Sequence, residues 1–124
     1  MKKFIVILLL LPSFLFADVI KDYQKQYSYL NTFKVESSAV CDMQTGETQE
    51  VKVILRKFTQ YCFIAQGTSD FHFQIIEASG NTWEGIFSRG NKMISLENVM
   101  DGGIYTIKIY SFSRNRVKLY WGEY

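Results

Sequence analysis

The chain opens with two lysines and a run of mostly apolar residues. Two lysines precede the apolar residues from Phe4 to Phe16, and the small residue Ala17 follows. This order of basic, apolar and small residues is typical of a secretory signal peptide. The run is shorter than the about 20 residues that a membrane-spanning helix needs. We therefore predict a signal peptide over residues 1–17, cleaved after Ala17, and a periplasmic or secreted protein without a membrane span. A retained anchor is the alternative.

A helical period follows the signal segment. The apolar residues Ile20, Tyr23, Tyr27 and Leu30 recur at intervals of three and four. This spacing gathers them on one face of a helix, and Asp18 suits the positive N-terminal end of that helix. We predict an N-terminal helix over residues 18–33 that packs against the rest of the domain. A helix that waits for a partner is the alternative.

From residue 34 onward the apolar period becomes two. Phe71, Phe73 and Ile75, for example, alternate with polar residues. The turn-forming sequences QTGE, GTS, ASGN and DGG interrupt this pattern at near-regular spacing. Seven or eight short strands of this kind predict an all-β fold, an antiparallel and jelly-roll-like β-sandwich over residues 34–124.

The last two strands predict a hairpin with one apolar and one polar face. The apolar residues expected in the core are Tyr105, Ile107, Ile109, Val117, Leu119 and Trp121. The residues expected on the opposite face are Thr106, Lys108, Tyr110, Arg116, Lys118 and Tyr120. Since side chains on one face of paired strands are neighbours, this second set predicts a basic and aromatic patch. The patch is either a binding surface or an ordinary solvated sheet face.

The charge of the chain argues against nucleic-acid binding. The full sequence has 14 Lys and Arg against 12 Asp and Glu. Loss of Lys2 and Lys3 with the signal peptide would leave 12 of each, and a nucleic-acid binder needs an excess of cations for the phosphates.

The two cysteines, Cys41 and Cys62, predict a disulfide. An even cysteine count in a small exported domain is typical of such a bond, and closing this loop would stabilise the fold by about 3 kcal/mol. Metal binding by the pair is the weaker alternative, because the short spacing of a zinc site is missing.

Catalysis is not indicated. His72 is the only histidine, and it should point away from the core between Phe71 and Phe73. Asp70 lies about 7 Å along the strand, beyond the reach that a catalytic base needs from its orienting partner. Ser79 lacks the Gly-x-Ser-x-Gly setting of an esterase nucleophile. We predict no enzyme, no cofactor and no metal site.

Residues 60–122 resemble the bacterial pre-peptidase C-terminal domain. The positions that carry the resemblance are Tyr61, Phe63, Ser79, Gly80, Asn81, Gly103, Tyr105, Ile107 and Ile109. The resemblance implies a jelly-roll-like β-sandwich. Periplasmic lysozyme inhibitors look like a variation on this fold, and some of them insert a Ser-Gly-x-x-Tyr loop into the lysozyme cleft. Here Ser79 to Trp83 stand at that place, with tryptophan instead of tyrosine.

We therefore predict a non-enzymatic binding or adaptor protein of the cell envelope that recognises another protein. One alternative is a lysozyme inhibitor that acts through Ser79, Asn81 and Trp83, as the resemblance implies. The other is a carbohydrate-binding module in which Trp83 or an exposed tyrosine stacks on a sugar ring. Neither the partner nor the oligomeric state follows from the sequence.

Overall fold

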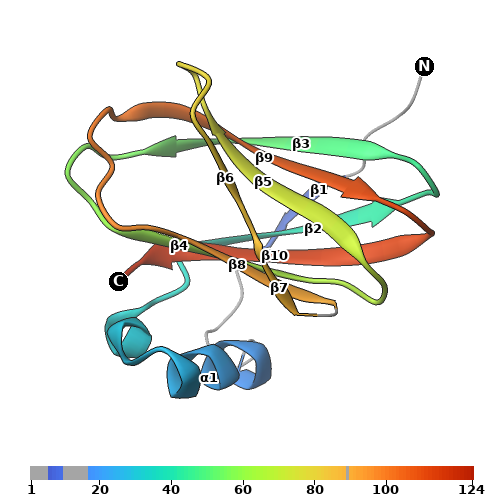
Figure 1. Ribbon diagram of the computed structural model, residues 1–124, viewed down its shortest axis with the longest axis horizontal. Helices are drawn as coiled ribbons and strands as arrows, with labels where there is room; N and C mark the ends of the chain where they lie inside the picture. Colours follow the sequence, from blue (N-terminus) through green and yellow to red (C-terminus); the bar gives the residue numbers. More distant parts are fainter. Residues whose placement is uncertain (1–5, 10–16, 89) are drawn as a thin grey trace.

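A computed structural model describes residues 6–9, 17–88 and 90–124, which form an antiparallel β-sandwich with one short α-helix (Figure 1). The elements before the first sandwich strands are β1 (Val6–Leu9), α1 (Ala17–Gln26) and the 3-10 helix η2 (Ser28–Thr32). The next strands are β2 (Ser37–Met43), β3 (Thr48–Leu55), β4 (Tyr61–Gln66) and β5 (Phe71–Glu77). The last strands are β6 (Thr82–Glu84), β7 (Ile86–Ser88), β8 (Asn91–Leu96), β9 (Gly103–Ser111) and β10 (Asn115–Glu123).

The strand order confirms the predicted jelly-roll-like sandwich. One sheet runs β1-β2-β10-β4-β8-β7 and the other β3-β9-β5-β6. Strands that follow one another along the chain, such as β2 and β3, β4 and β5, or β9 and β10, lie in different sheets. This alternation is how a jelly roll builds two sheets from one chain.

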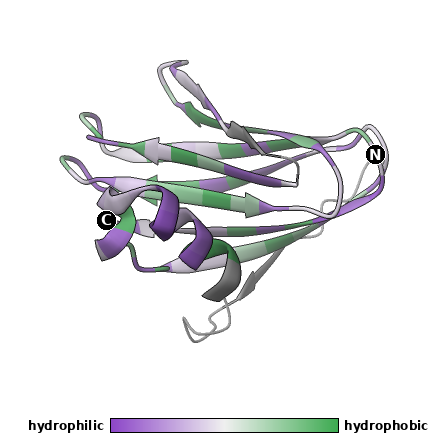
Figure 2. Cartoon of the chain, turned by 60° about the horizontal axis from the view of Figure 1, so that its bottom comes forward, coloured by the Kyte–Doolittle hydropathy of each residue, from purple (hydrophilic) through white to green (hydrophobic). Residues whose placement is uncertain are grey.

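The alternating pattern explains which side chains fill the space between the sheets. Phe71, Phe73 and Ile75 of β5 lie beside Tyr105, Ile107 and Ile109 of the neighbouring strand β9, and one buried cluster joins them with Val117, Leu119 and Trp121 of β10 in the other sheet. All nine residues are buried, as the period of two predicts. Figure 2 shows the same alternation as hydrophilic and hydrophobic bands along the strands.

The N-terminal helix packs on the outer face of the six-stranded sheet, as expected (Figure 1). Its helical stretch is shorter than predicted, because α1 ends at Gln26 and the chain continues as η2. The side chains that it covers are Cys62, Ile64, Met93 and Tyr120. The Gln24 amide also donates to the Leu30 carbonyl at 3.0 Å and ties α1 to η2. Neither α1 nor any other helix of the described residues is long and apolar enough to cross a bilayer.

The strand β1 lies inside the predicted signal segment. It pairs with the outer edge of β2, where Val6 is opposite Cys41 and Leu9 is opposite Ser38. The remaining residues of that segment, apart from Ala17, lie outside the described part of the chain, so cleavage and export stay predictions. Cleavage after Ala17 would leave β2 as an edge of its sheet.

The predicted hairpin of the last two strands is wrong. β9 pairs with β3 and β5, whereas β10 pairs with β2 and β4. Each strand has an apolar inner face, and packing the two faces across the sandwich buries more apolar surface than a lone hairpin would. Lys108 and Tyr110 are consequently separated by the whole sandwich from the outward side chains of β10.

The chain is divided at Gly85 into the short strands β6 and β7, one in each sheet. The Gly85 N–H donates to the Phe73 carbonyl at 2.9 Å. A Cβ at position 85 would lie 3.0 Å from the Phe73 ring and 3.1 Å from the Lys92 side chain. Glycine therefore permits the close approach at which the chain changes sheets.

The predicted disulfide is also wrong. Cys41 and Cys62 are free and buried, and they lie on opposite faces of one sheet, Cys41 in the core and Cys62 under the helix. On β10, Cys41 is opposite Val117 and Cys62 is opposite Gly122. The distance along the strand from Val117 to Gly122 is about 17 Å at the usual rise per residue. A disulfide needs Cα atoms within about 7 Å. The even cysteine count misled because each thiol packs as a small apolar side chain.

Both thiols should be inert in the folded protein. Burial raises the pKa of Cys41 and that of Cys62 to about 12 in each case, so the reactive thiolate is scarce at neutral pH. We expect no reaction with Ellman's reagent under native conditions and full reaction of both thiols after unfolding without reductant. A mass equal to that of the oxidised form, or a melting temperature that falls with reductant, would contradict this.

Candidate functional site

The outer face of the four-stranded sheet is the broad surface that the described helices leave open (Figure 1). β3, β9, β5 and β6 are in register across it, so their outward side chains form rows. One row consists of Thr48, Tyr110 and His72. The next consists of Glu50, Lys108, Gln74 and Glu84. The third consists of Lys52, Thr106, Ile76 and Thr82.

Three rings gather at one end of this face, and we call His72, Tyr110 and Phe112 the aromatic cluster. The Phe112 ring centre lies 4.8 Å from that of His72 and 5.1 Å from that of Tyr110, edge to face in both cases. His72 and Tyr110 are 6.2 Å apart. Phe112 is 47% exposed, which is unusual for a phenylalanine held by two other rings.

Polar groups lie directly beside the aromatic cluster. The Gln74 amide donates to the Glu84 carboxylate at 2.9 Å across β5 and β6, and Lys108 lies opposite Gln74 on β9. In the third row the Lys52 ammonium donates to the Thr106 hydroxyl at 2.7 Å. The face therefore offers aromatic surface and hydrogen-bonding groups of both kinds within neighbouring rows.

A small cavity opens at the edge of the same face. Its volume is about 30 Å³, and it is lined by His72, Phe73, Gln74, Glu84, Gly85 and Lys92. Lys92 is 2% exposed, its ammonium lies 3.1 Å from the Asp70 carboxylate, and it sits 5.4 Å from the Phe71 ring centre. A buried lysine needs such a partner, so the pair closes this end of the sandwich.

The Asp70–Lys92 pair makes stability depend on pH. The hydrogen bond from Lys92 lowers the pKa of Asp70 below its usual 3.8. A lowered carboxyl pKa adds stability that is present above the unfolded pKa and is lost as the pH falls through the folded one. We expect Asp70→Asn to cost about 1–3 kcal/mol at neutral pH, because the buried Lys92 ammonium loses the Asp70 carboxylate.

Denaturant unfolding of wild type and Asp70→Asn at several pH values checks this. The difference in the free energy of unfolding should shrink as the pH falls below 3.8. Asp22→Asn, on the exposed side of α1, is the matched control and should change little. A difference for Asp70→Asn that stays constant down to low pH would contradict the assignment.

The predicted residues Ser79, Asn81 and Trp83 do not form one exposed group. The Ser79 hydroxyl and the Asn81 amide both donate to the Glu77 carboxylate, and the Tyr105 hydroxyl does so as well at 2.9 Å. These bonds lower the pKa of Glu77, and burial together with Glu77 raises that of Tyr105 to about 12. Trp83 is half-buried, with its ring centre 6.3 Å from that of Tyr105.

The other predicted binding residues are divided between two sides of the molecule. Lys108 and Tyr110 lie on the open face described above, whereas Tyr120 is buried under the helix, and this burial raises its pKa. Arg116 is exposed and lies 3.4 Å from Asp42, at a shallow hollow of about 460 Å³ that Arg114 also lines. Lys118 is exposed on the same sheet. The basic and aromatic patch proposed from a hairpin is therefore not assembled.

The arrangement is suited to binding more than to catalysis. Asp70 is held by Lys92 and Ser79 by Glu77, so neither serves His72 as a catalytic partner. Among the described residues, no three His, Cys, Asp or Glu side chains gather as metal ligands. The sequence pattern identified Tyr110 and Lys108 as candidate binding residues. It did not connect them with His72, Gln74 and Glu84, although the alternation of apolar and polar residues indicated that these side chains point outward.

Comparison with known proteins identifies no family. No family model matches the chain, and no curated protein matches it, so the resemblance to the pre-peptidase C-terminal domain stays a prediction. Two mutants of the family 29 carbohydrate-binding module CBM29-2 are among the similar solved structures. One has a TM-score of 0.46 and 10% identity over 69% of this chain. The match spans 65% of that module, less than two thirds of its length. The other, complexed with cellulohexaose, has a TM-score of 0.45 and 12% identity over 69% of each chain. A likeness at this level transfers neither a ligand nor a site to this chain.

Proposed function

We propose that this protein is a non-enzymatic binding module of the cell envelope that recognises a glycan through the open face of its four-stranded sheet. The observation that carries the proposal is the aromatic cluster, placed one row from Gln74, Glu84 and Lys108. The C–H face of a sugar ring packs on aromatic surface. Its hydroxyls both donate and accept hydrogen bonds, so a carboxylate, an amide and an ammonium beside the rings match its needs.

The position of the face supports the same proposal. β3, β9, β5 and β6 are hydrogen-bonded strands over a packed core, so their outward side chains are held at fixed spacings before a ligand arrives. Preorganised groups lose little conformational entropy on binding. An open sheet face gives room to a chain of sugars, whereas a small isolated molecule is usually bound in a cleft.

Binding of the exported protein to purified cell-wall polysaccharides and to soluble oligosaccharides tests the proposal. We expect Phe112→Ala and Tyr110→Ala each to weaken binding about tenfold or more, the equivalent of about 1.4 kcal/mol. Phe58→Ala, at the opposite end of the sandwich, is the matched control and should bind normally. Failure of the wild type to bind any glycan of such a panel would refute the proposal.

The turn from Glu77 to Asn81 supports a second candidate, inhibition of a lysozyme-type hydrolase. Three side chains brace the Glu77 carboxylate, and the Glu77 N–H donates to the Asn81 carbonyl at 2.9 Å. Such a rigid, exposed turn is a suitable anchor for a partner's cleft. A lysozyme turbidity assay decides this candidate, since absence of protection at micromolar excess would eliminate it.

A further inference from the structure

A shallow hollow at one end of the sandwich lies outside the site described so far. Its volume is about 460 Å³, which is within the range of ligand-binding pockets. Its residues come from the β2–β3, β4–β5 and β9–β10 connections and the strand ends beside them, at the right of Figure 1. The polar residues that line it are Asp42, Gln44, Thr68, Arg114, Asn115 and Arg116. Such a lining suits a hydrophilic ligand.

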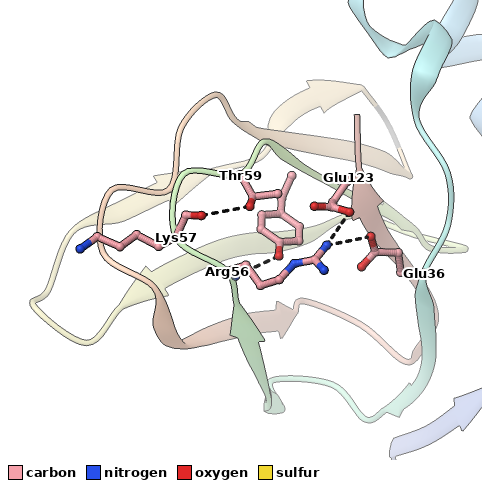
Figure 3. Close-up of polar contacts among 6 residues, drawn as sticks. Glu36, Arg56, Lys57, Thr59 and Glu123 are labelled. Atoms are coloured by element: carbon pink, nitrogen blue, oxygen red, sulfur yellow. Dashed lines mark hydrogen bonds and ion pairs between the residues drawn. The ribbon is translucent and has the colours of Figure 1, made fainter.

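The charge of the hollow is set by two arginines and one acid. Asp42 is the acid among the described lining residues, and it is paired with Arg116, whose Nε lies 3.4 Å from its Oδ1. Within the part of the chain that the structure describes, the Arg114 side chain is exposed and forms no ion pair or hydrogen bond. Arg56 differs, because two carboxylates hold its guanidinium (Figure 3). Arg114 therefore leaves its N–H donors for a ligand.

Hydrogen bonds fix the backbone on both sides of Arg114. The side-chain oxygen of Asn115 accepts from the Thr68 N–H at 2.8 Å and from the Thr68 hydroxyl at 2.9 Å. The Asn115 amide donates to the Ser69 carbonyl at 3.0 Å. On the other side, the hydroxyls of Ser113 and Ser69 lie 2.8 Å apart. Arg114 thus extends from a braced loop, so a ligand has to order little more than its side chain.

The hollow and the aromatic cluster share this end of the sandwich. Phe112 of the cluster precedes Arg114 by two residues on the β9–β10 connection, a span of at most about 7 Å. The β2–β3 turn makes the same link. A Cβ added to Gly46 of that turn would lie 4.0 Å from the Tyr110 hydroxyl, and Gln44 of the same turn lines the hollow. One extended ligand can therefore contact both features.

We propose that the hollow receives an anionic group of the glycan, so that the ligand is an acidic polysaccharide. This rests on the glycan-binding function proposed above and adds the charge of the ligand to it. A sugar ring packs on the aromatic cluster, and an acidic group of the same chain accepts hydrogen bonds from Arg114. The planar guanidinium matches paired oxygens of a carboxylate, a sulfate or a phosphate. Such charge-assisted bonds are about twice as strong as neutral ones, so an acidic glycan is favoured over a neutral one.

Calorimetric titration of the exported protein with matched polysaccharides tests the inference. Polygalacturonate and alginate are each compared with their carboxyl-reduced neutral forms, and cellulose sulfate is compared with hydroxyethyl cellulose. The wild type should bind the acidic member of at least one pair about tenfold more tightly than the neutral member. The preference should shrink as the salt concentration rises, because salt screens an exposed ion pair. The uronate and sulfate pairs distinguish a carboxylate from a sulfate as the group that binds.

Three variants separate the hollow from the rest of the molecule. Arg114→Gln should raise the dissociation constant of the acidic member about tenfold, with unchanged binding of the neutral member and an unchanged melting temperature. Lys57→Gln removes the same charge from the β3–β4 connection, at the left of Figure 1, and should bind like the wild type. Phe112→Ala should weaken the binding of both members, because the aromatic cluster contacts the sugar ring itself.

The outcomes distinguish this inference from the function on which it rests. Equal affinity for the acidic and neutral members, or an Arg114→Gln variant that keeps the preference, would overturn the acidic ligand and leave glycan binding intact. An equal loss in Lys57→Gln would overturn it as well, because net charge would then explain the preference. Absence of binding to every member of the pairs would refute both.

Discussion

Gly122→Ala is expected to destabilise the protein by about 3–5 kcal/mol, a large effect for the addition of one methyl group. A Cβ at position 122 would lie 1.8 Å from the Lys34 carbonyl oxygen and 2.9 Å from the Glu36 nitrogen. Both atoms belong to the backbone, so no side-chain rotation relieves the clash. The segment before β2 passes directly over β10 at this point, and only glycine leaves room for it.

Relief of the clash would cost hydrogen bonds as well. The Lys34 N–H donates to the Glu123 carbonyl at 3.1 Å, and the Glu36 N–H donates to the Trp121 carbonyl at 2.9 Å. Moving the segment away would break both bonds and loosen the connection between η2 and the sheet. Total stabilities are about 5–15 kcal/mol, so Gly122→Ala should remove a large share.

Thermal unfolding measures the effect, with a loss of about 15 °C or more expected. Gly80→Ala is the matched control. Gly80 has a φ of +102° and nothing within 4 Å of an added Cβ, so this change tests backbone strain alone and should cost about 1–2 kcal/mol. If Gly122→Ala were no more harmful than Gly80→Ala, the close passage over β10 would be wrong.

Ile107→Ala is expected to cost about 2–5 kcal/mol. Ile107 is completely buried, and it lies on the central strand β9 between Val51 of β3 and Ile75 of β5. These neighbours are fixed by hydrogen-bonded strands, so they cannot collapse into the space that the lost methyl groups leave. The cost therefore includes a cavity in addition to the lost burial.

Urea unfolding at low protein concentration checks this prediction. Ile104→Ala makes the same chemical change on the same strand, but its side chain is 58% exposed, so its effect should stay within about 0.5 kcal/mol. Equal effects of the two substitutions would mean that the inward and outward faces of β9 had been exchanged. Such an exchange would also remove Tyr110 from the proposed binding face.

The candidate site could be predicted only in part. The period of two placed Lys108 and Tyr110 on an outward face, and the structure agrees. The same reasoning applied to β5 gives an outward His72 and Gln74. Nothing in either strand states that β5 and β9 are neighbours, because a long stretch of chain separates them and the partner is chosen by the packing of the whole sandwich. The aromatic cluster was therefore invisible as a group.

Errors at the sequence level share one cause. The prediction of a hairpin assumed that β9 and β10 pair because they are close along the chain. The prediction of a disulfide assumed that Cys41 and Cys62 are bonded because the cysteine count is even. In the structure, Ser111 and Asn115 stand at the ends of strands in different sheets, and the two thiols face different apolar layers.

By itself the sequence determined most of the secondary structure, the inward and outward faces of the long strands and the all-β class, because these depend on periodicities within about ten residues. The tertiary structure alone decided the strand partners, the separation of the cysteines and the aromatic cluster. Which distant segments come into contact depends on the apolar surface that the whole sandwich buries, and a local sequence pattern does not contain that information.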